Sequence, residues 1–138
     1  MENRFYTSKD YQSLIQLYKN SSEFEFDEIT DSLEALERKI NKDSQSILVA
    51  YDNHELVGSV SIIEDGRIAI LFRLVATDND TTITTQLIAR AENLLVEKGF
   101  EEVHSIAPID NQAAEEIREK SKFTKGNTYH WFWKKINI

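Results

Sequence analysis

The arrangement of period-two apolar runs in the middle of the chain is the feature that most constrains its fold. Three runs, at 47–51, 56–63 and 68–75, are rich in Ile, Val and Leu and are separated by short polar links. The second link contains Asp65-Gly66, a pair that favours a type I′ hairpin turn because both central residues of that turn need positive φ. The pattern predicts a three-stranded antiparallel meander.

A long helix is predicted directly after the meander. It ends at Gly99, the residue best able to adopt the left-handed cap conformation, and 103–109 follows as a short strand. Because a crossover helix returns the chain in the same direction, this strand, helix and strand predict one parallel pair in an otherwise antiparallel sheet. The apolar stripe of the helix consists of Ile83, Leu87, Ile88, Ala91, Leu94 and Leu95.

The N-terminal third predicts one strand followed by two helices. Residues 1–6 form the strand, and Thr7 with Asp10 forms a capping box that opens the first helix. Thr30 or Asp31 is the expected cap of the second helix. The core-facing residues of the two helices are expected to be Tyr11, Leu14, Ile15, Leu17 and Tyr18, and then Leu33, Leu36 and Ile40.

The C-terminal part predicts a last helix and an aromatic strand. Asp110 or Asn111 caps the helix, and residues 129–136 form the strand, with the sequence Tyr-His-Trp-Phe-Trp at its start. One face of such a strand must pack on the core, because both faces cannot be solvated without exposing large rings. The other face is expected in a homodimer interface, in the wall of a binding pocket or under the preceding helix.

Length, charge and residue types exclude several classes of function. The 138 residues fit a single domain, 1–138. A formal net charge of −8 disfavours nucleic acid as a partner, and no apolar run is long enough for a membrane span. The absence of cysteine excludes disulfides and thiolate chemistry, and a cytoplasmic location is the default expectation.

Histidines and serines provide no recognisable catalytic or metal-binding motif. The spacing of His54, His104 and His130 matches no metal-ligand pattern, so no metal is expected. His104 is expected close to the place where the parallel strands meet, and His130 is interpreted as a structural residue of the last strand. A nucleophile elbow of the form G-x-S-x-G does not occur.

Three short motifs resemble those of the GNAT N-acetyltransferase superfamily. They are Glu55-Leu56-Val57-Gly58, Glu97-Lys98-Gly99-Phe100, and the pattern formed by Asn111, Ala114, Glu119, Lys120 and Phe123. With the element order, the resemblance covers 46–136. It implies a three-layer α+β fold with a mixed, mostly antiparallel sheet and one splayed parallel strand pair. It also implies acetyl-CoA as co-substrate, bound in that gap, and an amine that attacks the thioester.

The resemblance assigns cofactor-binding roles to residues around the main helix. Backbone groups at the end of the preceding strand would polarise the thioester, and the helix start would hold the pyrophosphate. Two residues of the later helix would complete the site, while the catalytic residues are unknown. The assigned residues are Leu74, Val75, Ala76, Thr81, Thr82, Ile83, Thr84, Thr85, Asn111 and Arg118.

The chain departs from the family pattern at two places. Thr82 and Thr84 occupy the positions of the two glycines of the pyrophosphate motif, and the carboxylates of Asp78 and Asp80 can cap the same NH groups. The helix start is therefore either a self-capped structural terminus or an altered pyrophosphate site. Arg118 occupies the position of the family's proton-donating tyrosine, and it either stabilises a thiolate or phosphate or lies on the helix surface.

Charged residues of the N-terminal half are relevant to the acetyl acceptor, the amine that would receive the acetyl group. Seven acids there lack a nearby base and either form a rim that attracts a cationic amine or solvate the helices. Arg73 binds an acidic acceptor or faces solvent, whereas the bases of the second half suit CoA phosphates. The acids are Glu23, Glu25, Asp27, Glu28, Asp31, Glu34 and Glu37, and the bases include Arg90, Lys98, Arg118, Lys120, Lys122 and Lys125.

These observations lead to one main hypothesis and two alternatives. The main hypothesis is an acetyl-CoA-dependent N-acetyltransferase that acts on a small-molecule or peptide amine, such as a polyamine, an aminoglycoside or a lysine side chain. The first alternative is a catalytically degenerate GNAT-fold protein with a binding or regulatory role, which the missing glycines and tyrosine favour. The second is an unrelated α+β interaction module that shares only the element order.

Overall fold

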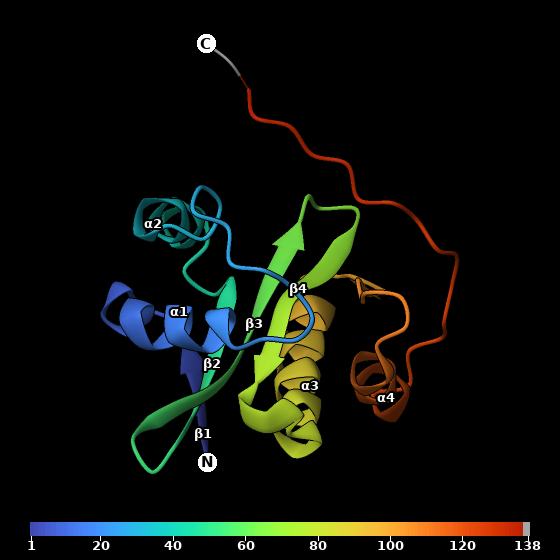
Figure 1. Ribbon diagram of the computed structural model, residues 1–138, viewed down its shortest axis with the longest axis horizontal. Helices are drawn as coiled ribbons and strands as arrows, with labels where there is room; N and C mark the ends of the chain where they lie inside the picture. The colour runs from blue at the N-terminus through green and yellow to red at the C-terminus, as the bar shows by residue number, and fades with distance from the viewer. Residues whose placement is uncertain (137–138) are drawn as a thin grey trace.

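A five-stranded sheet lies at the centre of the computed structural model, which describes residues 1–136 (Figure 1). Its strands follow one another in chain order as β1 (Glu2–Phe5), β2 (Ile47–Asp52), β3 (Glu55–Glu64), β4 (Ala69–Ala76) and β5 (His104–Ser105). Neighbouring strands are antiparallel except β4 and β5, which are parallel. The predicted meander and the predicted parallel pair are both confirmed.

Helices cover both faces of the sheet. They are α1 (Tyr11–Lys19), α2 (Leu33–Lys42), α3 (Thr81–Glu97) and α4 (Gln112–Lys120), with single 3₁₀ turns η1 (Ser8–Asp10) and η2 (Thr77–Asn79). One apolar core joins α1 and α2 to the sheet, and a second joins α3 and α4 to it. The protein therefore has the expected three-layer α+β fold.

Strand β2 shows how one strand contributes to both cores. Ile47 and Val49 pack with α1 and α2, whereas Leu48 and Ala50 pack with α3. Successive side chains of a strand point to opposite faces of the sheet. A strand that is covered on both faces therefore has a continuous run of apolar residues in its sequence. This is why the meander carries so many aliphatic residues in direct succession.

Gly58 permits the close approach of α3 to β3. A Cβ atom at this position would lie 2.5 Å from Ile83 Cγ2 and 3.0 Å from Leu87 Cδ1. We therefore expect Gly58→Ala to lower the free energy of unfolding by about 1–3 kcal/mol, as overpacked cores do. Urea denaturation would measure it, with Gly126→Ala as control because no atom lies within 4 Å of its added Cβ. Equal stability of the two variants would contradict the prediction.

The predicted capping box of Thr7 and Asp10 is confirmed, and it begins η1, which continues into α1. The buried Asp10 carboxylate accepts hydrogen bonds from the Arg4 guanidinium at 2.6 and 2.9 Å, from the Tyr51 hydroxyl at 2.5 Å and from the Thr7 NH at 2.9 Å. Burial acts to raise the pKa of Asp10, but the hydrogen bonds from Arg4, Tyr51 and Thr7 together hold it below its usual value.

This depressed pKa predicts an acid-dependent contribution of Asp10 to stability. The contribution is fully present above the unfolded pKa of about 3.9 and is lost as the pH falls through the lower folded value. We expect Asp10→Asn to lower the free energy of unfolding by about 2 kcal/mol at pH 7, because hydrogen bonds to charged groups are lost. Denaturation at pH 7 and pH 3 should show a smaller difference from the parent at pH 3. A pH-independent difference would contradict this account.

The structure corrects two predicted boundaries and one predicted core residue. Helix α2 begins after Ser32, whose side chain accepts a hydrogen bond from the Ala35 NH, so Thr30 and Asp31 are not its cap. Leu33, in the first turn of α2, is exposed instead of core-facing. The strand predicted at 103–109 consists of His104 and Ser105 alone, because β4 pairs with β5 at only two positions.

The predicted aromatic strand at 129–136 is wrong. This segment has no regular secondary structure and extends away from the sheet (Figure 1). Tyr129, Trp131, Phe132 and Trp133 are 82%, 70%, 90% and 76% exposed, so the expected packing of one face on the core is also absent. A strand needs a hydrogen-bonded neighbour, and within residues 1–136 no other strand lies beside this segment.

Candidate functional site

Strands β4 and β5 separate soon after they meet, and a bulge in β4 lies next to this point. The two strands pair only at Ile70 with His104 and at Leu71 with Ser105. On the other edge of β4, Phe72 pairs with Ser61 and Val75 with Ser59, so Arg73 and Leu74 form a bulge opposite one residue of β3. The bulge gives Arg73 a φ of 53° and bends the strand that carries it.

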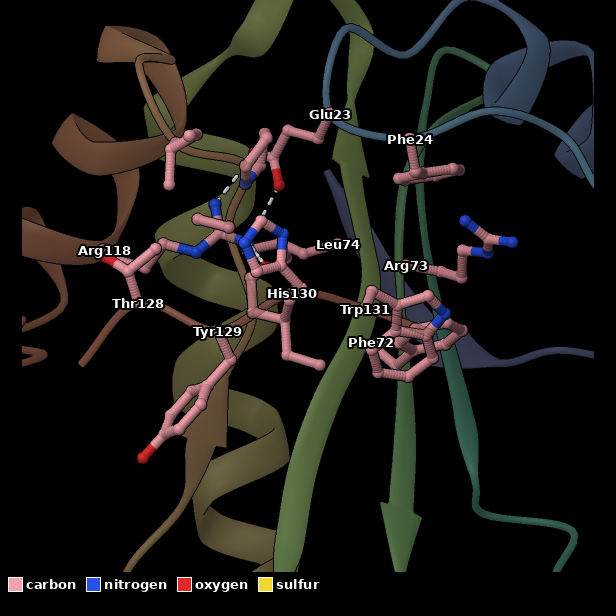
Figure 2. A pocket seen from close by; sticks show the side chains of 14 residues that line it. Glu23, Phe24, Phe72, Arg73, Leu74, Arg118, Thr128, Tyr129, His130 and Trp131 are labelled. Atoms are coloured by element: carbon pink, nitrogen blue, oxygen red, sulfur yellow. Dashed lines mark hydrogen bonds and ion pairs between the residues drawn. The ribbon is translucent and has the colours of Figure 1, made fainter. Parts of the chain in front are cut away.

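A cavity of about 410 Å³ lies beside this bulge (Figure 2). Its volume falls within the range of small-molecule sites. The walls come from the α1–α2 loop, the bulge, the loop after β5, α4 and the C-terminal segment. The lining residues are Glu23, Phe24, Phe72, Arg73, Leu74, Ile106, Ala107, Pro108, Ile109, Arg118, Thr128, Tyr129, His130 and Trp131.

Arg73 forms a buried ion pair with Asp31 at one side of the cavity. Its Nη2 lies 2.8 Å from Asp31 Oδ2 and its Nε 3.2 Å from Asp31 Oδ1, and the side chains are only 11% and 4% exposed. The guanidinium also lies 4.4 Å from the ring centre of Phe24 and 4.9 Å from that of Phe72. Arg73 therefore does not face solvent, and Asp31 already balances its charge.

Burial dominates the electrostatics of this pair. It raises the pKa of Asp31, against the hydrogen bond from the Asp27 NH and the charge of Arg73, which lower it. Burial likewise raises the pKa of Tyr18, which belongs to the adjacent core. The ion pair therefore connects the α1–α2 loop to the bulge. Because Arg73 balances the charge of Asp31, this residue adds no free negative charge to the expected acidic rim.

Arg118 makes a second buried ion pair, with Glu23. Two of its nitrogens lie 2.8 Å from the two Glu23 carboxylate oxygens, and the side chains are 10% and 8% exposed. The guanidinium also donates to Ser105 Oγ and to the carbonyl oxygens of Ile106 and Ala114. The alternative of a surface arginine is therefore wrong, and Arg118 joins α4 to β5 and to the α1–α2 loop.

The start of α3 is capped by its own side chain. Asp80 Oδ1 accepts hydrogen bonds from the NH groups of Thr82 at 2.9 Å and Ile83 at 3.2 Å. Thr84 is buried, and its hydroxyl lies 3.3 Å from the carbonyl oxygens of Asp80 and Thr81. At the same end of the helix, Lys120 Nζ lies 3.1 Å from Thr81 Oγ1. The self-capped terminus is thus present, with a lysine beside it.

The other residues assigned to the cofactor lie in several places. Leu74 lines the cavity, whereas Val75 and Ala76 are buried in the cores on opposite faces of the sheet. Thr85 is half-buried in the first turns of α3. Asn111 caps α4 by accepting from the Ala114 NH and donates to the Ser22 carbonyl oxygen. The structure therefore groups Leu74 with Arg118 at the cavity, and Thr81 to Thr85 at the start of α3.

His130 and Tyr129 line the cavity, and the wall of a binding pocket was one of the three places expected for one face of this segment. The interpretation of His130 as a packed residue is wrong, since it is exposed and lines the cavity with Tyr129 (Figure 2). Histidine is the side chain that most readily exchanges a proton near neutral pH. His104 does not line the cavity and lies 3.0 Å from Glu102. Residue 130 lies near residues 23 and 73 only in the folded chain, so no spacing in the sequence indicates that these residues line one cavity.

Two further features of residues 1–136 bear on ligand and membrane binding. No three histidine or acidic side chains lie close enough together to hold a metal ion. None of the helices in this part of the chain has the length and apolar character needed to cross a membrane.

Comparison with known proteins identifies one sequence relative and several similar structures. No family model matches the chain. An acetyltransferase of Pectobacterium atrosepticum is 31% identical over 125 residues, which cover 89% of this chain and 87% of that protein.

The similar structures include N-acetyltransferases. The PaiA N-acetyltransferase of Thermoplasma acidophilum, solved with coenzyme A, has a TM-score of 0.77 at 21% identity, covering 93% of this chain and 92% of its own. The aminoglycoside 6′-N-acetyltransferase of Acinetobacter haemolyticus has a TM-score of 0.72 at 17% identity, covering 99% and 100%. An aminoglycoside acetyltransferase from an uncultured soil sample, solved with sisomicin, has a TM-score of 0.73 at 20% identity, covering 99% and 96%.

Proposed function

Since this chain belongs to the GNAT N-acetyltransferase superfamily, we propose that it transfers the acetyl group of acetyl-CoA to an amine bound in the cavity beside β4. The observation that carries the proposal is the separation of β4 and β5 just beyond Leu71, with the bulge at Arg73 and Leu74 and the cavity next to it. A cytoplasmic location, expected from the sequence, is part of the same proposal.

The start of α3 is the proposed site of the CoA pyrophosphate. The N-terminal end of a helix attracts anions, and the hydroxyls of Thr81 and Thr82 and the Lys120 ammonium group offer further donors there. The Asp80 carboxylate competes, because it occupies the NH groups of Thr82 and Ile83. The residues present fit a pyrophosphate when this cap opens. The PaiA structure solved with coenzyme A supports the choice of cofactor.

This competition predicts opposite effects of two substitutions on acetyl-CoA binding. Asp80→Ala removes the cap and its charge, so we expect acetyl-CoA to bind up to about tenfold more tightly while the protein loses about 1 kcal/mol of stability. Lys120→Met removes a cation and should weaken binding several-fold. Isothermal titration calorimetry measures the acetyl-CoA affinity of both variants. Asp80→Asn keeps a capping side chain but removes its charge, so it distinguishes the effect of the charge from the effect of the cap. Unchanged affinity in both Asp80→Ala and Lys120→Met would contradict this site.

In the proposed reaction, the neutral amine attacks the thioester carbonyl carbon and the bond from that carbon to sulfur breaks. Backbone NH groups at Leu74 and Val75 would polarise the carbonyl as negative charge develops on its oxygen. His130 is the proposed acceptor of the proton lost by the amine, because it lines the cavity and neither Arg73 nor Arg118 can act as a base. The CoA thiolate leaves and takes up a proton from water or from the protonated His130, which restores the neutral imidazole.

A cationic amine of small size is the proposed acceptor. The rings of Phe24, Phe72 and Trp131 line the cavity, and aromatic faces attract ammonium groups. The exposed Glu25, Asp27 and Glu28 lie on the adjacent loop and retain part of the acidic rim. Polyamines and aminoglycosides have this chemistry, and the sisomicin complex of a structural neighbour supports the choice. A peptide with a lysine side chain would offer the same kind of cationic amine to the cavity.

A titration of acetyl-CoA, with desulfo-CoA and ATP as controls, tests the proposal first. Micromolar binding that prefers the CoA compounds over ATP supports it, and release of free thiol on addition of spermidine or an aminoglycoside completes the test. The alternative is a GNAT-fold binding or regulatory protein without turnover, and the Asp80 cap at the pyrophosphate position favours it. Absence of binding at millimolar acetyl-CoA would contradict the proposal and favour that alternative.

A further inference from the structure

The loop between α1 and α2, residues 20–32, is held near both of its ends by buried ion pairs on different sides of the cavity. Near its start, Glu23 pairs with Arg118 of α4 (Figure 2). Near its end, Asp31 pairs with Arg73 of the β4 bulge. None of the four side chains is more than 11% exposed. The loop therefore connects the β4 side of the cavity to the α4 side.

Arg118 extends this connection to β5. Its Nε donates to Ser105 Oγ at 3.1 Å, and its Nη2 donates to the Ile106 carbonyl oxygen at 2.9 Å. Two further N–H groups donate to Glu23 and one to the Ala114 carbonyl oxygen, so all five donors of the guanidinium have partners. These bonds hold the guanidinium in one geometry, so that Glu23 is joined to β5 through a fixed side chain.

The two ion pairs lie just beyond the point where β4 and β5 stop pairing. Leu71 and Ser105 are the last residues that pair, and in the described part of the chain no backbone pairing joins the two strands beyond them. Arg73 follows Leu71 by two positions, and Ile106 follows Ser105 directly. Side-chain contacts must therefore set the distance between the separated strands, and the α1–α2 loop supplies such contacts to both.

Internal contacts make the loop a single ordered unit. The Asp27 NH donates to Asp31 Oδ2 at 2.9 Å, and the Asp31 NH donates to the Asp27 carbonyl oxygen, also at 2.9 Å. The Phe24 ring packs edge-on against Tyr18 of α1, with ring centres 5.2 Å apart. Because the loop is fixed within itself and against α1, the position of one end constrains the position of the other.

We propose that the α1–α2 loop is a brace that sets the width of the gap between β4 and β5, and that Glu23 and Asp31 are positioning residues for the acetyl transfer, a role that rests on the proposed function. Both carboxylates act through the arginines that they hold. The thioester is proposed to lie in this gap, so the width of the gap decides how closely the amine approaches the carbonyl carbon. A misplacement of about 1 Å can lower a rate about a hundredfold.

The two ion pairs act in series, so release of either end of the brace should have the whole effect. Asp31→Leu with Arg73→Met releases the β4 end, and Glu23→Leu with Arg118→Met releases the β5 end. Each pair variant removes both charges, so no charge is left buried alone. The fourfold variant should then differ little from either pair variant. Two ion pairs with separate local roles would instead have effects that add.

Distance measurements by electron paramagnetic resonance test the brace without any turnover. The chain has no cysteine, so spin labels attach only where Arg67→Cys, in the β3–β4 turn, and Glu119→Cys, exposed on α4, introduce one. We expect a narrow distance distribution in the parent and an equally broadened one in both pair variants and in the fourfold variant. Glu115→Leu with Lys125→Met removes a surface ion pair of 2.7 Å and should keep the narrow distribution.

Kinetics of the unlabelled proteins separate positioning from stability, with spermidine as acceptor and release of free thiol as the signal. In each pair variant we expect kcat to fall about tenfold to a hundredfold, while the affinity for acetyl-CoA is unchanged. The surface-pair control should keep the kcat of the parent. Arg118→Lys keeps a charge opposite Glu23 but lacks the planar fork of donors, so its kcat should be intermediate. This variant replaces a pair variant that does not fold.

The outcomes distinguish failure of the brace from failure of the proposed function. An unchanged, narrow distance distribution in the pair variants would overturn the brace, and so would effects that add in the fourfold variant. Equal broadening with an unchanged kcat would overturn the positioning role of the two carboxylates. If the parent transfers acetyl groups to no amine, the proposed function and the positioning role both fail, and the distance distributions still decide whether the loop is a brace.

Discussion

Replacement of Asp31 by asparagine is expected to lower the free energy of unfolding by about 3–5 kcal/mol, because it leaves the Arg73 guanidinium buried without a countercharge. Removal of one partner of a buried ion pair is costly even where the intact pair contributes little, since the remaining charge keeps its full desolvation penalty. Such a loss is a large part of the stability of about 5–15 kcal/mol that is typical of a protein domain. Chemical denaturation of parent and variant gives the difference.

A surface pair provides the matched control for this substitution. Asp65 Oδ2 and Arg67 Nη2 are 3.7 Å apart, and both side chains are exposed. Asparagine at position 65 can still accept the backbone hydrogen bonds of the turn. Asp65→Asn should therefore leave the denaturation midpoint unchanged within error. The double variant Asp31→Leu with Arg73→Met should recover most of the stability lost in Asp31→Asn. A loss in the double variant as large as that in Asp31→Asn would contradict the unpaired-charge explanation.

The Arg73 pair links the stability of the fold to the shape of the site. Arg73 belongs to the bulge of β4, has a positive φ and contacts Phe24 and Phe72, which line the cavity. A positive φ is unfavourable for a residue with a long side chain, so the surrounding contacts must maintain it. The ion pair with Asp31 is one of these contacts, and it joins the loop after α1 to the bulge.

Elements coded by local signals were predictable from the sequence. The meander follows from period-two runs and the Asp65-Gly66 turn, and α3 follows from an apolar stripe that ends at Gly99, whose φ is 91°. The parallel pair then follows from chain direction alone. Each of these inferences uses residues close together in the sequence, where periodicity and turn chemistry act.

The partners of the buried charges were not predictable in this way. Asp31 and Arg73 are 42 positions apart, and Glu23 and Arg118 are 95 apart. Because no base lies near them in the sequence, both acids were interpreted as parts of an acidic stretch that either attracts a cationic amine or solvates the helices. The pairing also explains the displaced start of α2, because Asp31 bonds to Arg73 and leaves the cap to Ser32.

The failure of the C-terminal strand prediction has a different physical origin. The residue pattern at 129–136 is that of a strand, but a strand forms only where its backbone pairs with another strand, and this segment pairs with none among residues 1–136. Sequence periodicity indicates which side chains share a face, but it does not indicate whether the segment pairs with another strand. His130 was interpreted as a structural residue of this strand for the same reason.

Arg118→Met is expected to lower the free energy of unfolding by about 3–5 kcal/mol while the affinity for acetyl-CoA stays unchanged. The substitution leaves the Glu23 carboxylate buried without its partner and removes the hydrogen bonds to Ser105, Ile106 and Ala114. All of these contacts are internal, so the guanidinium is not available to a phosphate in this arrangement. Denaturation and calorimetric titration, performed on the same preparation, measure the two quantities.

The two readouts together decide which role Arg118 has. Arg67→Met is the control, since Arg67 is exposed and should change neither stability nor affinity. Glu23→Leu combined with Arg118→Met should restore much of the stability, because both buried charges are then removed. If Arg118→Met instead retained its stability and bound acetyl-CoA at least tenfold more weakly, the guanidinium would be a ligand of the cofactor, as the family resemblance implies. The pair with Glu23 would then have to open on binding, and the loop after α1 would move with it.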